Sequence, residues 1–267
     1  MRRHFCRFFT LLLAMNKIAQ VTLLFWIMKI CATTLGETAG DLLAQTMKVG
    51  YGASSLILIG FFLVVLAGQL AVSHYIPALY WATILATSTA GTTMSDYMDR
   101  TLGLGYATGS LILVSLLGLV LGLWWLRERS LSVTEIKTRT GEVFYWAAIL
   151  VSNTLGTALG DFLADDSGLG FGGGALLIGS LLAVLVLAYY FTGISRVLLF
   201  WAAFVLTRPF GATFGDLLTK PVAKQGLGLG TQGSSLVLFG LLVALVLYET
   251  FRKQPAVGEA PDRLAPR

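Results

Sequence analysis

Four aspartates follow four tryptophans at a constant distance of 15 residues. The pairs are Trp26 and Asp41, Trp81 and Asp96, Trp146 and Asp161, and Trp201 and Asp216. A glycine lies 10 residues after each tryptophan, at Gly36, Gly91, Gly156 and Gly211. The segments that hold the aspartates are otherwise apolar enough to cross a bilayer, where a carboxylate is costly. Four such carboxylates in one register of an internal repeat are therefore the best indication of function in this sequence.

Polar residues also recur at steps of four before each aspartate, which places them on one face of a helix. The four series are Asp41–Glu37–Thr33–Lys29, Asp96–Thr92–Ser88, Asp161–Thr157–Asn153 and Asp216–Ala212–Arg208. Such a face belongs inside a helix bundle, because lipid offers polar groups no partner. An aspartate in the last turn of a helix opposes the helix dipole. This predicts either a helix break at the preceding glycine or a cationic partner for the carboxylate.

Oxygen ligands of Asp, Glu and Thr suit hard or borderline cations such as Mn²⁺, Mg²⁺, Ca²⁺, Na⁺ or H⁺. The predicted ligands of the cation are Asp41, Asp96, Asp161, Asp216 and Glu37, and the same five residues would bind a metal ion. Thr33, Thr92, Thr157 and Asn153 would line the path, with Lys29 and Arg208 as built-in counter-charges. If all were ionised, five acids against two bases would leave a net charge of −3, which favours a cation.

A structural interpretation of the same residues stays open. Aspartates at helix ends can fix loops by accepting backbone hydrogen bonds. An ion pair between Lys29 and Glu37, or between Arg208 and Asp41, would tie repeats together without any transport. The repeated tryptophans are expected to pack against neighbouring helices.

Nothing in the sequence indicates an enzyme or a cofactor. His4 and His74 are the only histidines and lie outside the polar series, and Cys6 and Cys31 form no CxxC motif. Glycine-rich segments such as 103–111 lack the preceding strand that a nucleotide-binding loop requires. The pI near 9.3 reflects basic residues beside apolar spans, which favours a membrane surface over nucleic acid.

The composition is that of a polytopic membrane protein: 56% of the 267 residues are hydrophobic and 12% charged, with a mean hydropathy of +0.78. We expect an all-α integral membrane protein with eight transmembrane helices, arranged as four parallel two-helix repeats. The expected spans are 18–42, 53–73, 76–98, 107–126, 143–163, 173–192, 196–218 and 232–251.

The spacing of the tryptophans divides the chain into two membrane halves, 18–126 and 143–251. They are joined by a cytoplasmic linker at 127–142 and flanked by a basic lead-in at 1–17 and a disordered tail at 252–267. Met15 is an alternative start. Thirteen Lys and Arg residues fall on one side of the predicted spans and four on the other, which predicts that both termini are cytoplasmic.

The Trp-x9-Gly-x4-Asp pattern, with ATTLGETAGD at 32–41 and SNTLGTALGD at 152–161, resembles a bacterial membrane-protein family defined by a fourfold repeat of unknown function. Its members are labelled uncharacterised membrane-anchored proteins. The resemblance covers roughly residues 16–251 and implies two membrane helices per repeat. Repeat 4 departs from the pattern, since Arg208-Pro209 and Ala212 replace the usual polar residues.

These observations predict a cation transporter or exporter of the bacterial inner membrane, with an inorganic cation, such as Mn²⁺, as substrate and the lipid bilayer as surroundings. The arrangement is compatible with a homo-oligomer. The alternatives are a non-transporting membrane scaffold whose charges only lock the repeats together, and a carrier of a small organic solute whose carboxylate binds Arg208 and Lys29.

Overall fold

The computed structural model describes residues 17–133, 136 and 138–252, so most of the predicted lead-in and tail lies outside the described residues. The described part is helical and contains no strand. Its eight long helices are α2 (Leu23–Asp41), α3 (Tyr51–Ala71), α4 (Pro77–Asp96), α5 (Tyr106–Glu128), α6 (Arg139–Asp161), α7 (Gly170–Phe191), α8 (Arg196–Thr219) and α9 (Thr231–Arg252). The all-α class and the positions of the predicted helical segments are confirmed.

Six of these helices are long and apolar enough to cross a membrane, judged on the described residues: α3, α5, α6, α7, α8 and α9. Helices α2 and α4 fall short because their sequences are rich in polar residues, such as Lys29 and Glu37 in α2 and a run of threonines in α4. Both helices are largely buried, so their polar side chains face protein.

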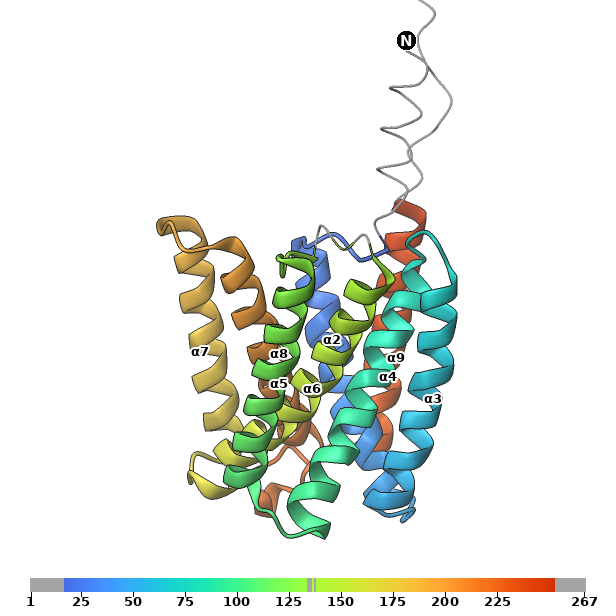
Figure 1. Ribbon diagram of the computed structural model, residues 1–267. Coiled ribbons are helices and arrows are strands. Elements are labelled where there is room, and N and C mark those ends of the chain that lie inside the picture. Colours follow the sequence, from blue (N-terminus) through green and yellow to red (C-terminus); the bar gives the residue numbers. More distant parts are fainter. Residues whose placement is uncertain (1–16, 134–135, 137, 253–267) are drawn as a thin grey trace, which may run out of the picture.

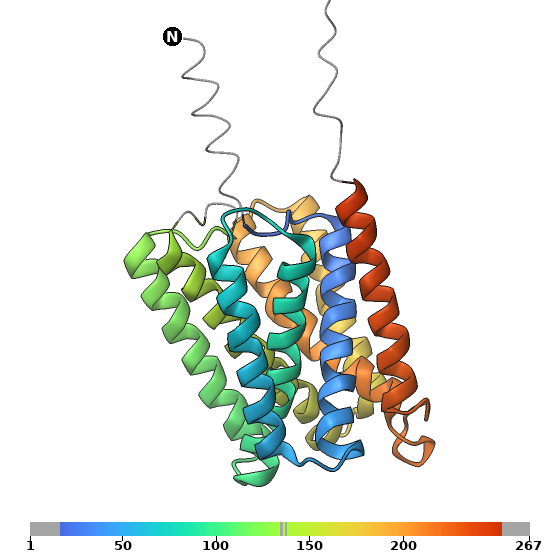
Figure 2. The same cartoon turned by 90° about the vertical axis from the view of Figure 1, so that its right-hand side faces the viewer.

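The first helices of the four repeats form an inner ring, in which α2 packs on α4, α4 on α6, α6 on α8, and α8 on α2. The second helices lie outside this ring (Figures 1 and 2). Each of them covers the inner helix of the following repeat: α3 packs on α4, α5 on α6, and α7 on α8. Helix α9 packs on α2 and so closes the circle. The inner ring is thereby shielded on all sides, and residues of four separate repeats meet along its axis.

The repeated glycines are the points at which the inner helices approach one another. A Cβ atom added at Gly36 would lie 2.3 Å from Cβ of Ser88, and one at Gly211 would lie 2.5 Å from Oγ1 of Thr33. The other two positions repeat this geometry: Gly91 lies against Asn153, and Gly156 against Arg208. The residues that these glycines contact all come seven positions after a repeat tryptophan. The helices continue through the glycines, so the predicted alternative of a helix break there is wrong.

The repeat tryptophans lie near the N-terminal ends of α2, α4, α6 and α8. Helix α2 begins at the same end of the bundle at which α9 ends (Figure 1). Trp81, Trp146 and Trp201 are buried. The indole of Trp81 donates to Glu249 Oε2 at 3.0 Å, and the indole of Trp201 donates to the carbonyl of Leu131 at 3.0 Å. As expected, they pack between helices.

Candidate functional site

The four repeat aspartates lie at the opposite end of the inner ring, and all are buried. Asp41, Asp96 and Asp161 are the last residues of α2, α4 and α6. Each is followed at once by a five-residue π-helical turn: Leu42–Thr46, Tyr97–Thr101 and Phe162–Asp166. In α8, the ordinary helix continues past Asp216 to Thr219. Turns of the π type recur at functional sites. Here each one lies where the chain leaves an inner helix of the ring.

Two cationic side chains join these aspartates in pairs across repeats. Arg100 contacts Asp96 through Nε at 2.8 Å and Asp161 through a terminal nitrogen at 3.0 Å. Lys220 contacts Asp41 at 2.6 Å and Asp216 at 3.1 Å. The contacts to Oδ1 of Asp96 and of Asp216 are charge contacts, because these atoms lack hydrogen-bond geometry. The predicted cationic partner of the helix-end carboxylates is therefore present.

Lys220 lies just beyond α8 and is 17% exposed, whereas its two carboxylate partners are 3% exposed. Burial lowers the pKa of Lys220, but the charges of Asp216 and Asp41 and the hydrogen bond to Asp41 outweigh this and raise the pKa above its usual range. Lys220 thus keeps its charge at physiological pH while its side chain stays within reach of solvent.

Further along the axis, Arg208 extends from α8 into the middle of the ring and is fully buried. It pairs with Glu37 Oε2 at 3.0 Å and donates to Thr92 Oγ1 at 2.5 Å. Thr92 and Thr157 each donate a hydrogen bond to the same Glu37 oxygen, at 3.3 and 3.4 Å. The pair that forms is therefore Arg208–Glu37, instead of either ion pair considered from the sequence.

Lys29 is also fully buried, and its surroundings differ from those of Arg208. Its ammonium group donates to Oδ1 of Asn153 at 3.4 Å and lies 3.8 Å from the ring centroid of Phe204. Within the described part of the chain, no carboxylate lies within salt-bridge distance of it. Thr33, one turn further along α2, donates to the carbonyls of Ile30 and Thr207.

The structure gathers three of the five predicted ligands into one cluster. Glu37, Asp41 and Asp216 each offer a carboxylate oxygen, and these oxygens lie within 4.8 Å of one another. We call these three residues the acidic triad. Asp96 and Asp161 lie apart from it, joined by Arg100. The donor set suits a hard cation, since all three ligands are oxygen.

The charge of the ring is less negative than the sequence predicted. Arg100 and Lys220 add two bases to Lys29 and Arg208, so with every group ionised five acids face four bases and the formal net charge is −1. The expected spans 76–98 and 196–218 end before Arg100 and Lys220, so sequence reasoning left both residues out of the predicted site. Both residues come four positions after a repeat aspartate, and this spacing is a signal that could have identified them.

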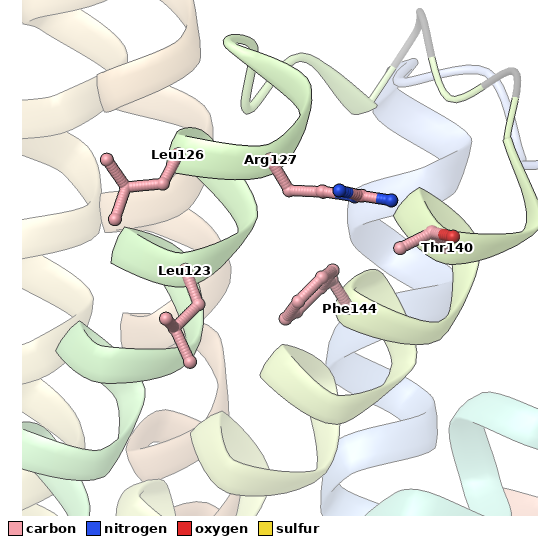
Figure 3. A pocket seen from close by; sticks show the side chains of 5 residues that line it. All are labelled: Leu123, Leu126, Arg127, Thr140 and Phe144. Carbon is pink, nitrogen blue, oxygen red and sulfur yellow. The ribbon is translucent and has the colours of Figure 1, made fainter.

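One open surface pocket lies between α5 and α6, away from the predicted site (Figure 3). It is lined by Leu123, Leu126, Arg127, Thr140 and Phe144. Its surface is mostly apolar and holds none of the predicted ligands, so it does not contribute to the candidate cation site.

The comparisons with known proteins identify the repeat. Residues 24–75, 79–130, 144–195 and 199–254 match the family described as Repeat of Unknown Function (DUF347). The four matches cover most of the chain, which therefore belongs to this family. No curated protein and no solved structure matches the chain.

Proposed function

We propose that this member of the DUF347 repeat family is a carrier of an inorganic cation, bound by the acidic triad. In this proposal all eight long helices cross a bacterial inner membrane, with both termini in the cytoplasm and the repeat aspartates at the outer end. The protein would move its substrate without chemical change. The observation that carries the proposal is the triad itself, in which three buried carboxylates lie within 4.8 Å of one another.

The local charge supports a cation as the ligand. Glu37, Asp41 and Asp216 carry three negative charges, and Arg208 and Lys220 supply two positive ones. One negative charge is therefore left over in a buried place, where an uncompensated charge is costly. A bound monovalent cation or a proton would balance it.

Lys220 gives the triad a means of accepting a larger charge. Its ammonium sits between two triad carboxylates, where it acts as a tethered cation. Because the side chain is partly exposed at the end of α8, it can turn outward into solvent. The triad with Arg208 then carries −2, which matches a divalent ion such as Mn²⁺. Entry of the substrate and departure of Lys220 are thus expected to be coupled.

Uptake into proteoliposomes tests the proposal, with H⁺, Na⁺, Mg²⁺, Ca²⁺ and Mn²⁺ offered in turn. The informative variant is Asp41→Asn/Asp216→Asn, which removes two triad ligands. The matched control is Asp96→Asn/Asp161→Asn, which removes two equivalent aspartates outside the triad. Selective flux that disappears in the first folded variant and persists in the control supports the carrier. Equal flux in the wild type and in the triad variant contradicts it.

The competing function is a membrane scaffold, and the same ion pairs favour it. Arg100 joins repeats 2 and 3, whereas Lys220 and Arg208 join repeats 4 and 1. In a scaffold these pairs only lock the ring. This alternative predicts that both double variants are equally unstable, and that no cation crosses the membrane even in the wild type.

A further inference from the structure

Three buried hydrogen-bond donors lie at one level of the inner ring without enough acceptors. The ammonium of Lys29 has three N–H bonds, yet its one hydrogen bond to a described residue, Asn153, is long at 3.4 Å. Nε of Arg208 is buried and has no acceptor among the described residues. The same holds for the hydroxyl of Ser88. Leaving buried donors unpaired costs about 1–3 kcal/mol each, and more for charged groups.

The contacts of α2, α4 and α8 bring the three residues that carry these donors close together. The terminal nitrogens of Arg208 donate to the carbonyls of Thr33 and Ser88, at 3.5 and 3.3 Å. Thr33 follows Lys29 by one helical turn. Phe204, whose ring lies under the Lys29 ammonium, precedes Arg208 by one turn. Lys29 and Arg208 therefore face each other across the α2–α8 contact, with Ser88 beside them.

The charges at this level of the ring are also unbalanced, because the basic side chains outnumber the carboxylates. Two permanent or potential cations, Lys29 and Arg208, face one carboxylate, that of Glu37. Glu37 already pairs with Arg208 and accepts from two threonines. The remaining cation, Lys29, has an amide oxygen and an aromatic face as its described partners. A cation–π contact contributes about 2 kcal/mol when desolvated, which is less than the cost of burying an ammonium without a counter-ion.

We propose that Lys29, Arg208 and Ser88 form a binding site for one small monovalent anion, either free chloride or the carboxylate of a small solute. One negative charge balances the surplus positive charge, and its lone pairs accept from the three unsatisfied donors. The site adjoins the acidic triad, because Arg208 also pairs with Glu37 at 3.0 Å, whereas Lys29 precedes Asp41 by twelve residues on one helix, about 18 Å. It does not depend on cation transport.

Thermal unfolding of the purified full-length protein in detergent tests the site. Potassium salts of chloride, formate and acetate are titrated at constant ionic strength against gluconate, a much larger anion. We expect a saturable rise in Tm of about 5 °C for an anion that fits. Saturation by chloride alone identifies free chloride as the ligand, whereas saturation by formate or acetate identifies a carboxylate.

Repeat-matched variants locate the effect. Lys29→Ile introduces the residue type found at the corresponding positions of repeats 2 and 3, Ile84 and Ile149, and should abolish the rise in Tm. Ser88→Ala should shift the titration midpoint to about tenfold higher anion concentration. Ser54→Ala removes another buried, unpaired hydroxyl on α3 and should leave the titration unchanged.

Two results would overturn the site. One is a wild-type Tm that depends only on ionic strength, whichever anion is present. The other is an anion effect that survives unchanged in Ser88→Ala and Lys29→Ile. If Lys29→Ile does not fold, Ser88→Ala still decides, because it removes no charge. Neither result bears on flux through the acidic triad, so failure here leaves the carrier proposal to its own test.

Discussion

Removing either partner of the Arg208–Glu37 pair should have unequal effects on stability. Glu37→Gln leaves a guanidinium fully buried without a counter-ion, and a guanidinium cannot lose its proton in a protein. Arg208→Asn leaves a buried carboxyl, which can take up a proton and become neutral. Breaking a buried pair from one side costs about 3–5 kcal/mol. We therefore expect about 4 kcal/mol for Glu37→Gln and a clearly smaller loss for Arg208→Asn.

The double variant Glu37→Gln/Arg208→Asn completes a mutant cycle. It removes both charges and places at position 208 the residue that repeat 3 carries at Asn153. Its loss should be smaller than the sum of the two single losses, because neither charge is left alone. Reversible unfolding in mixed micelles, followed by tryptophan fluorescence, measures all four free energies. Equal losses for the two single variants, or strict additivity in the double variant, would refute the reasoning.

Three further predictions concern the ring and its ends. Gly211→Ala places a methyl group 2.5 Å from Oγ1 of Thr33, so it should lower the free energy of unfolding by about 1–3 kcal/mol; an unchanged unfolding curve contradicts the close packing. Lys220→Gln introduces the residue type that repeat 1 carries at this position. It removes the tethered ammonium that competes with a divalent cation, so the affinity for divalent cations should rise about tenfold in equilibrium dialysis. Weaker binding would show that Lys220 instead helps the triad to bind the cation. Lys17→Ala leaves the carboxylate of Glu142, which is 4% exposed, without its ion-pair partner and should lower the unfolding free energy by about 1–3 kcal/mol; an unchanged value in the same fluorescence assay would contradict this.

The helical fold follows from the sequence because its main signals are local. Membrane-length apolar segments and the tryptophan register predict the helices to within a few residues; the span expected at 107–126 is observed as Tyr106–Glu128. The polar series from Lys29 to Asp41 is buried as expected. These features depend on side-chain periodicity within one helix, which the sequence displays directly.

The partners of the polar residues were not predictable in the same way. Long Arg and Lys side chains reach back from helix ends, so Arg100 and Lys220 enter the ring although their backbones lie beyond the predicted spans. The pairing of Arg208 with Glu37 depends on how α8 meets α2, a contact between the first and last repeats. No periodicity within a single repeat specifies that contact.

Equilibrium binding of cations to the purified protein tests the central claim most directly. The account predicts one selectively bound cation per chain, binding that is lost in Asp41→Asn/Asp216→Asn, and binding retained in Asp96→Asn/Asp161→Asn. Both variants should first be shown to be folded by their unfolding curves. Undiminished binding in the folded triad variant, or no binding of any cation to the wild type, would contradict the assignment of the acidic triad as a cation site.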